Sequence, residues 1–465
     1  MMLFKIAFRN IRRNARRSTM TASAIVVGAV ALVLFGEFMA NVTTGFQTNT
    51  VERTGHLSVF RAGYFDFGAG NPAAYGIADY RRVMDLIAED PVLRPWLNVV
   101  TPTVTLFGIA GNFDIDASKT FFGSGVVPSD RDRMRLWDEY GIFRGRILAD
   151  SGLSDDDETV GVVGIGLARA LGLCEALKLA NCPPRPRAAE EPGETAASEL
   201  MDLARRDRDT ISPQHADAAP RLDLLAATAG GAPNVLSLTV SKAEPQGAKE
   251  LDDAFIAMHF KLAQRLLYGR GEPKAVGIVL QLHRSEDMAA ARVRLERLFK
   301  ERALELEVRD FTELLPFYKQ VIGLFGAIFS FIAAIMGVIV LFTVVNTMSM
   351  TVIERTNEIG TARAMGVRRS VIRRQFLIEG WMLGAIGASV GLILAALLAW
   401  LINNGGLTWT PPGQALPVPL RVLTSGVAPL NLAVWLGLVA VATVAALIPA
   451  NRAARLPVVD ALRHV

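Results

Sequence analysis

The chain has 465 residues, 51% of them hydrophobic, and its 49 Lys and Arg against 45 Asp and Glu give a formal net charge of +4. A basic excess can indicate nucleic-acid binding, but here it is explained by Arg residues beside long apolar segments, so we expect no nucleic acid partner. The chain has two Cys residues and no second Cys or His pair at ligand spacing, which argues against a zinc site.

Residues 1–18 are predicted to form an amphipathic helix on the cytoplasmic side. Phe4, Ala7, Phe8 and Ile11 recur at helical spacing, and the basic residues lie largely opposite them. This pattern is typical of a helix on the inner membrane surface, so membrane lipid is an expected partner. A cleaved signal peptide is the alternative. The next apolar run exceeds the usual ~7–15 residues of such peptides, which favours a retained anchor.

Four apolar segments are long enough to cross a bilayer, which takes about 20 residues of helix. Core helices of soluble proteins normally show one polar face, and three of these four segments lack it. The predicted transmembrane helices cover residues 19–46, 319–350, 375–402 and 429–449. Glu37 is expected to reach the membrane interface. Six glycines are expected to allow close helix packing: Gly323, Gly326, Gly337, Gly384, Gly387 and Gly391.

The basic residues predict the orientation of these helices. Lys and Arg gather before the first helix, in residues 351–374 and in the tail 450–465, whereas the short loop 403–428 contains one, Arg421. Basic residues that flank membrane helices favour the cytoplasmic side. We therefore expect both termini in the cytoplasm of a bacterium, a multi-pass protein in its inner membrane, and residues 47–318 outside.

The external region 47–318 is predicted to be an α+β domain. Strand-like runs cover 57–60, 99–107, 160–163, 235–240 and 275–282, and helical patterns cover 78–88 and 285–301. Ser285 is the expected N-cap of the second helix, with Ala289, Val293 and Leu298 on its buried stripe. Residues 183–233 lack aromatic side chains and are rich in Pro, Ala and charge, so a flexible insertion is expected there.

No catalytic constellation is evident in this region. The five His residues are scattered outside any metal-binding spacing, and the acidic pairs are typical of solvated loops. The chain has no Gly-Lys dipeptide and hence no P-loop, so if this protein uses ATP, another chain must bind the ATP and its Mg²⁺. Cys174 and Cys182 are expected to close a small disulfide loop, with two free buried thiols as the alternative.

The loop between the second and third helices carries the most informative motif. Residues Glu354–Gly366 read ERTNEIGTARAMG, within the longer run TVIERTNEIGTARAMGVRRSVIRRQFLIEG. This run and the tail ANRAARLPVVDALRHV resemble the permease subunits of ABC transporters of the MacB, LolC/LolE and FtsX group. Two external segments, ELDDAFIAMHFKLAQRLL and LEVRDFTELLPFYKQV, look like those of LolE-like permeases.

The resemblance implies that residues 351–374 contain a cytoplasmic coupling helix that docks on a separate ABC ATPase. Ile359, Ala362 and Met365, three residues apart, are expected to form an apolar docking ridge, beside the small residues Gly360 and Ala364. Charged neighbours would supply ion pairs at the rim. The alternative is a helix that merely lies at the interface. The expected coupling residues are Glu354, Arg355, Glu358, Ile359, Gly360, Ala362, Arg363, Ala364, Met365 and Gly366.

Three functions are consistent with this resemblance. The leading one is a non-enzymatic permease subunit that converts ATP hydrolysis by its partner into movement of the external domain and releases lipoproteins to a periplasmic carrier. A MacB-like export permease working with an adaptor is the alternative, as is an FtsX-like signal transducer that activates a cell-wall hydrolase. In each case the chain is expected to pair with a second copy or a related permease.

Overall fold

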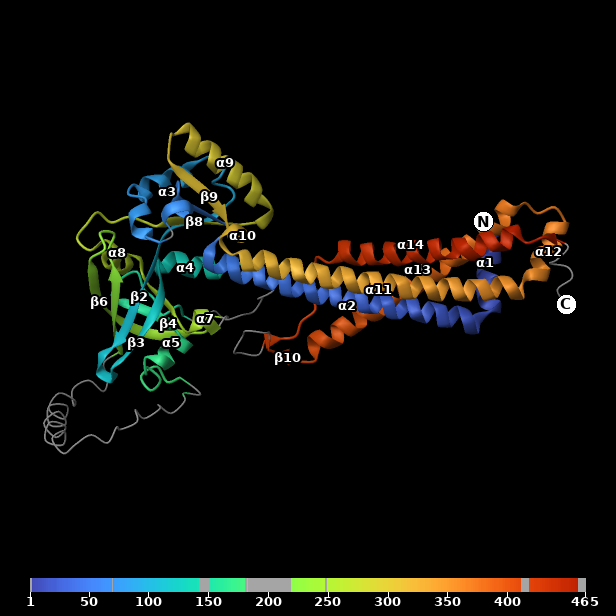
Figure 1. Cartoon of the computed structure of the whole chain (residues 1–465), viewed down its shortest axis with the longest axis horizontal. Coiled ribbons are helices and arrows are strands. Elements are labelled where there is room, and N and C mark those ends of the chain that lie inside the picture. Colours follow the sequence, from blue (N-terminus) through green and yellow to red (C-terminus); the bar gives the residue numbers. More distant parts are fainter. Residues whose placement is uncertain are drawn as a thin grey trace, which may run out of the picture. The chain divides into compact units, whose positions relative to one another are not determined.

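The computed structural model describes residues 2–68, 70–141, 150–179, 182, 219–246, 249–410 and 418–458. The chain divides into two compact units (Figure 1). One consists of Met1–Phe46, Leu315–Trp409 and Val418–Val465, and the other of Gln47–Leu314 and Thr410–Pro417. We call them the helical unit and the external unit.

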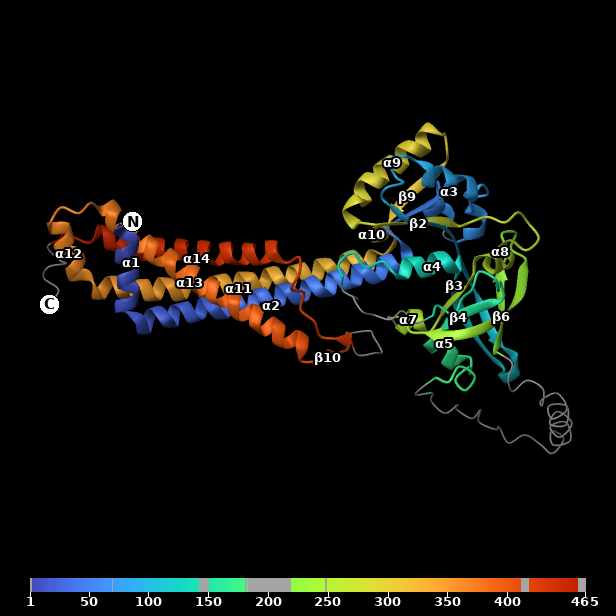
Figure 2. The same cartoon turned by 180° about the vertical axis from the view of Figure 1, so that it is seen from behind.

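The helical unit contains four helices that are long and apolar enough to cross a membrane. They are α2 (Ala15–Thr54), α11 (Pro316–Glu354), α13 (Arg369–Asn404) and α14 (Ala428–Arg455). Two short helices, α1 (Met2–Arg13) and α12 (Thr356–Ala364), lie together at one end of these helices (Figures 1 and 2). A small hairpin, β10 (Thr408–Trp409) and β11 (Val418–Pro419), follows α13.

All four helices exceed the ~20 residues that a bilayer requires, α2 and α11 by the most. Helices α2 and α11 contain 40 and 39 residues, which at about 1.5 Å per residue is roughly 60 Å each, against about 30 Å for the hydrocarbon core. The predicted segments 19–46 and 319–350 lie within these two helices, which extend beyond them at both ends. The last turns of α2, from Gln47 to Thr54, belong to the external unit.

Glycines on α13 allow two neighbouring helices to approach closely. A Cβ atom on Gly384 would lie 2.9 Å from the Ala442 Cβ of α14, and one on Gly391 would lie 2.4 Å from the Ala29 Cβ of α2. The sequence prediction of close packing is thus correct for α13. It is wrong within this chain for α11, since a Cβ on Gly323, Gly326 or Gly337 would meet nothing within 4 Å.

Glu37 of α2 does not extend to the interface as predicted. Its side chain is buried, with 4% exposed, and its Oε1 accepts a hydrogen bond from Asn431 Nδ2 at 3.0 Å. Leu423 N donates to the Glu37 carbonyl oxygen at 3.3 Å. A buried carboxylate requires hydrogen-bonding partners, and Asn431 supplies one. Together the two contacts connect α2 to the start of α14 and to the segment before it.

The external unit contains one sheet with the strand order β3-β7-β4-β6-β5-β2-β8-β1-β9 and an additional β2–β3 pairing. Its first strands are β1 (Leu57–Arg61), β2 (Leu97–Asn112), β3 (Ala117–Val126) and β4 (Val160–Gly164). The others are β5 (Arg221–Ala227), β6 (Pro233–Glu244), β7 (Phe255–His259), β8 (Gly277–Leu282) and β9 (Leu306–Asp310).

The long strand β2 divides this sheet into two parts. Its first half, Leu97–Thr103, pairs with β8, which leads through β1 to the edge strand β9. Its second half pairs with β3 on one side and β5 on the other, so that β2, β3, β7, β4, β6 and β5 form a closed ring of strands. Closure leaves these strands without a free edge for pairing with other chains.

Helices complete the external unit. They are α3 (Tyr80–Glu89), α4 (Pro128–Arg135), α5 (Ile165–Ala170), α7 (Lys249–Asp252), α8 (Phe260–Tyr268), α9 (Met288–Glu301) and α10 (Phe311–Leu314). Figure 1 shows α3 and α9 beside β8 and β9, and α5 and α8 beside the closed ring. Apolar side chains from both parts join one core. The α+β fold that the sequence predicts is therefore present.

Two predictions about this unit were wrong in detail. Ser285 opens a short 3-10 turn, and Asp287 is the N-cap residue of α9. Val293 is 55% exposed and Ala289 is also exposed, whereas Ala291, Leu295 and Leu298 are buried, so the buried stripe is rotated from the predicted one. The buried residues recur at spacings of four and three and so lie on one helix face, which the predicted set shares only through Leu298.

The predicted insertion 183–233 is also corrected in part. Residues Arg221–Ala227 form β5, which pairs with both β2 and β6, so this segment is an integral part of the closed ring. Leu222 and Leu224 are buried there, and their alternation with Asp223 is the period of a half-buried strand. Residues 183–218 lie outside the described residues.

The junction between α2 and β1 is closely packed. Gly55 has φ of 68°, and a Cβ there would lie 2.7 Å from the Leu280 carbonyl oxygen, so this turn requires glycine. His56 is fully buried: its Nδ1 accepts from Leu282 N at 3.0 Å and its Nε2 lies 3.1 Å from Ser285 Oγ. Gln281 Nε2 donates to the Val51 carbonyl oxygen at 3.1 Å. The end of α2 is thereby fixed to β8.

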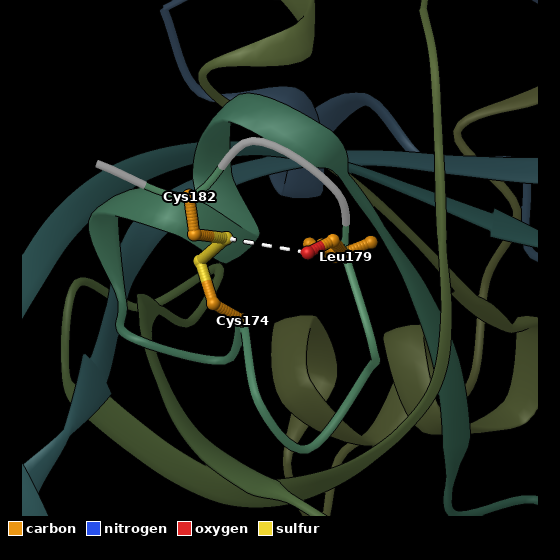
Figure 3. The surroundings of a disulfide bond; sticks show 3 residues. All are labelled: Cys174, Leu179 and Cys182. Carbon is orange, nitrogen blue, oxygen red and sulfur yellow. Dashed lines mark hydrogen bonds between the residues drawn. A yellow bond between two sulfur atoms is a disulfide. The ribbon is translucent and has the colours of Figure 1, made fainter. Parts of the chain in front are cut away.

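Cys174 and Cys182 form a disulfide in the external unit (Figure 3). Their Cα atoms are 6.2 Å apart, and Cys182 Sγ lies 3.8 Å from the Leu179 carbonyl oxygen. The bond closes a short loop that follows α5. Stable disulfides are typical of oxidising compartments.

Candidate coupling site

The predicted coupling segment forms a short helix between two backbone breaks. Arg355 separates α11 from α12 with φ of −103° and ψ of 13°, and Gly366, with φ of 92°, follows α12. A nine-residue helix is marginal on its own in water. Within α12 the buried residues are Ile359 and Gly360, so apolar packing alone anchors this helix at one point.

A closed circuit of polar contacts surrounds Arg355. Arg355 Nε donates to Glu358 Oε2 of α12 at 3.1 Å, and its Nη1 donates to Glu379 Oε1 of α13 at 3.1 Å. From α1, Arg13 Nη2 donates to Glu358 Oε1 at 2.8 Å and Asn10 Nδ2 donates to Glu379 Oε1 at 2.6 Å. We call these five residues the clasp. It contains two cations and two anions, so its charges balance.

The members of the clasp differ in burial and therefore in how much each pair contributes to the free energy of unfolding. The side chains of Arg355 and Glu379 are 9% and 3% exposed, and the Arg355 guanidinium lies 5.7 Å from the centroid of the Phe376 ring. Removing one partner of a buried pair typically costs about 3–5 kcal/mol, because the other charge is left unpaired. Arg13 and Glu358 are about half exposed, and such a pair contributes about 0–1 kcal/mol.

Hydrogen bonds to Glu358 also set its charge state. Partial burial tends to raise the pKa of this carboxyl, but the hydrogen bonds from Arg355 and Arg13 outweigh burial and hold the pKa of Glu358 below its ordinary value. Glu358 therefore stays ionised at neutral pH, as the ion pair requires. A second contact, between Arg17 of α2 and Glu354, lies beside the clasp.

The structure corrects the predicted docking surface. Ile359 is 7% exposed and belongs to the core of the helical unit, so it does not continue a ridge to the exposed Met365, which is 76% exposed. Glu354, Arg355 and Glu358 pair with Arg17, Glu379 and Arg13 of the same chain instead of standing free at a rim. Ala362 and Arg363 are half-buried, Gly360 is buried, and Ala364 and Gly366 are exposed.

Three residues of the clasp were not among the sequence candidates. Glu379 stands at the start of an apolar segment, where a single acid is usually assigned to the membrane interface. Asn10 and Arg13 lie among the basic residues of an amphipathic helix. An acid inside a predicted transmembrane segment needs a partner, and that requirement was the available signal. Among the described residues, no group of three His, Cys, Asp or Glu side chains is placed to hold a metal ion.

These features define a multi-pass membrane protein with four transmembrane helices, an α+β domain between the first and second, and a short helix between the second and third. Residues 329–458 match the family model of the FtsX-like permease C-terminal domain. This match covers most of α11 and all of α12, α13 and α14. Within residues 329–458, the chain therefore contains an FtsX-like permease C-terminal domain.

Relatives with curated names agree with this assignment. The chain is 31% identical over 157 residues to the macrolide export ATP-binding/permease protein MacB of Rhodopirellula baltica, covering 34% of this chain and 21% of MacB. It is 29% identical over 229 residues to the pyoverdine export ATP-binding/permease protein PvdT of Pseudomonas entomophila, covering 49% and 33%. It is 40% identical over 73 residues to the ABC transporter permease YtrF of Bacillus subtilis, covering 16% and 17%.

The chain thus spans a third or less of the length of these relatives. Among solved structures, the periplasmic region of MacB from Actinobacillus actinomycetemcomitans aligns with a TM-score of 0.31 at 13% identity, over 59% of this chain and 95% of that one. The extracellular domain of the transporter YknZ from Gram-positive bacteria aligns with a TM-score of 0.28 at 10% identity, over 54% and 98%.

Proposed function

We propose that this chain is the transport subunit through which a separate ABC ATPase moves the external unit. The observation that carries the proposal is the connection of the two long helices to the external sheet. Helix α2 leads into β1, and β9 leads through α10 into α11; β1 and β9 pair antiparallel, with Leu57 opposite Asp310. Movement of α12 at the far end of α11 would reach these paired strands along stiff helices.

The orientation proposed from the basic residues has independent support. The Cys174–Cys182 disulfide is typical of an oxidising compartment, which supports a position of the external unit outside the cytoplasm. Arg12, Arg13, Arg16 and Arg17 flank α2 at the other end, as expected for the cytoplasmic side. We therefore propose an inner-membrane protein with cytoplasmic termini, in which α12 faces the cytoplasm.

The proposed ATPase contact is centred on Met365 and Gly366. Met365 is the most exposed large apolar residue of the segment, and the φ of 92° at Gly366 holds the turn that presents it. Exposed Ala364 and Thr361 lie on the preceding turn. An unbranched apolar side chain on a small-residue surface suits insertion into a cleft of a partner.

We propose that helix α11 carries the surface that contacts a second copy of the permease. Six small residues fall within one face over about four turns: Gly323, Gly326, Ala327, Ser330, Ala334 and Gly337. Most of this face is exposed, and Cβ atoms on its glycines would meet nothing within 4 Å. Small residues allow membrane helices to approach closely, so α11 is the proposed contact between two permease chains.

The proposed work of the complex is export driven from the external side. Residues Val321–Met350 contain no charged side chain, which disfavours a polar path through the helices. Two of the relatives carry names of export proteins, for macrolides and for pyoverdine. We therefore favour the MacB-like alternative, with an external adaptor as a partner. Lipoprotein release and activation of a cell-wall hydrolase stay predictions.

The proposal is tested by replacing Met365 with Asp in the full chain reconstituted with the ABC ATPase of its host. We expect the chain to fold and to lose most of its effect on ATP hydrolysis, because a charge cannot enter an apolar cleft without a partner. Leu136→Asp, at a residue of the external unit that is 68% exposed, is the matched control. Unchanged hydrolysis in Met365→Asp would contradict the proposed contact, as would ATP hydrolysis by the purified chain alone.

A further inference from the structure

The position of α12 depends on helix α1 through the clasp. Asn10 and Arg13, three residues apart on α1, reach Glu379 of α13 and Glu358 of α12, and Arg355 joins these two carboxylates. The circuit thus connects three helices. Along the chain, 345 residues separate Arg13 from Glu358, so the contact is formed only in the folded protein.

Apolar packing contributes little to the orientation of α12. It is bounded by the break at Arg355 and the turn at Gly366, and Ile359 is its one large buried side chain. One apolar anchor fixes the depth of a short helix but allows rotation about that anchor. Directional hydrogen bonds from charged groups restrict such rotation, because they weaken steeply when their geometry changes.

We propose that the clasp sets the position of α12, and that Asn10, Arg13 and Glu379 are positioning residues for coupling to the ATPase. This inference rests on the proposed function. According to this inference, α1 is part of the path that carries force between the ATPase and the external unit, in addition to lying at the membrane surface. Neither Asn10 nor Glu379 touches the ATPase; both act through α12.

Apolar contacts between α1 and α13 hold in place the helix that supplies Asn10 and Arg13 to the clasp. Ala7 is fully buried, and the Phe4 ring packs edge-on against Trp381 with ring centroids 6.0 Å apart. These apolar contacts hold α1 against α13 without the ion pair. Arg13 and Glu358 are half exposed, so changing their charges alters the ion pair that holds α12 without removing a core residue.

The first test measures hydrogen exchange of the amides of residues 356–364 in the purified full chain without ATPase. Arg13→Glu places two acids together, and we expect roughly three- to tenfold faster exchange in α12. Arg13→Lys keeps the positive charge beside Glu358 and should leave exchange near the original rate. Arg12→Glu is the matched control, because Arg12 makes no ion pair with any described residue. Equal exchange in all four proteins would overturn the proposal.

The second test measures the response of the ATPase in the reconstituted complex. Arg13→Glu should reduce coupling and Arg13→Lys should largely keep it, in parallel with exchange in α12, which a direct contact of Arg13 with the ATPase does not predict. Full coupling in Arg13→Glu, while Met365→Asp is uncoupled, would overturn the role of the clasp and leave the proposed function intact. Loss of coupling in Arg13→Glu with full coupling in Met365→Asp would support the clasp and contradict docking at Met365.

Discussion

At the scale of single residues, His56 connects the end of α2 to the sheet. Because Nδ1 accepts the Leu282 amide, the neutral ring carries its proton on Nε2 and donates to Ser285. The ring also packs edge-on against Trp137, with centroids 5.0 Å apart. Burial disfavours the charged form and lowers the pKa of His56 to about 4. A neutral imidazole is therefore part of this junction.

The stability of the chain should consequently fall as the pH decreases from about 6.5 to about 4. In this range the unfolded state binds a proton at His56 and the native state does not, so stability is complete above the unfolded pKa and declines below it. The difference between the two pKa values corresponds to about 3 kcal/mol. Chemical unfolding of the full chain at pH 7 and pH 5 should show about 2 kcal/mol of this loss, the part that falls between pH 6.5 and pH 5.

His56→Gln is the control for this prediction. It should be less stable at pH 7 but should lose much less stability on acidification. Burial also lowers the pKa of His259, so some dependence on pH should persist in the variant. An identical pH dependence in both proteins would show that His56 is not responsible.

At the scale of elements, α11 and α13 use their small residues differently. The glycines of α13 meet Ala442 of α14 and Ala29 of α2, whereas those of α11 face away from the described residues of this chain. Sequence alone cannot separate these cases, because the same residues serve contacts within a chain and between chains. The structure separates them by what a Cβ atom would meet.

Leucine substitutions should therefore have opposite effects on these two helices. Gly391→Leu should destabilise the single chain, by roughly 1–3 kcal/mol or more, because its Cβ would overlap Ala29. Gly326→Leu should leave the single chain folded and weaken self-association in the membrane. Thermal stability in detergent and energy transfer between labelled copies in vesicles measure the two effects. Equal effects of both substitutions on stability would contradict this distinction.

Sequence periodicity predicted the existence of most elements but not how they face one another. Strands β1 and β4 and helix α3 were expected close to their observed bounds, because their apolar periods are regular. The four membrane helices were expected, but they extend beyond the predicted apolar segments. The sequence could not predict that Ile359 packs into the core of the helical unit. A three-residue spacing shows that residues share one helix face, but it does not show what covers that face. The clasp was missed for the same reason: its charges come from three distant segments, each of which has an ordinary local explanation.

At the scale of the whole molecule, α2 leads into β1 and β9 leads through α10 into α11, so two long helices connect the coupling end to the external sheet. The helical unit supplies stiffness, since α2 and α11 are unbroken over 40 and 39 residues. The external unit receives both helices on the adjacent strands β1 and β9. Any force on α12 is then expected to alter the arrangement of external units in a pair of chains.

The most direct test of this central claim is a distance between two external units. A spin label on Glu272→Cys, an exposed residue, should react alone, because Cys174 and Cys182 are bonded to each other. In the reconstituted complex, trapping the ATPase with ATP should change the distance between the labels by several ångströms or more, and Met365→Asp should abolish the change. An unchanged distance, or a change that persists in Met365→Asp, would contradict the account.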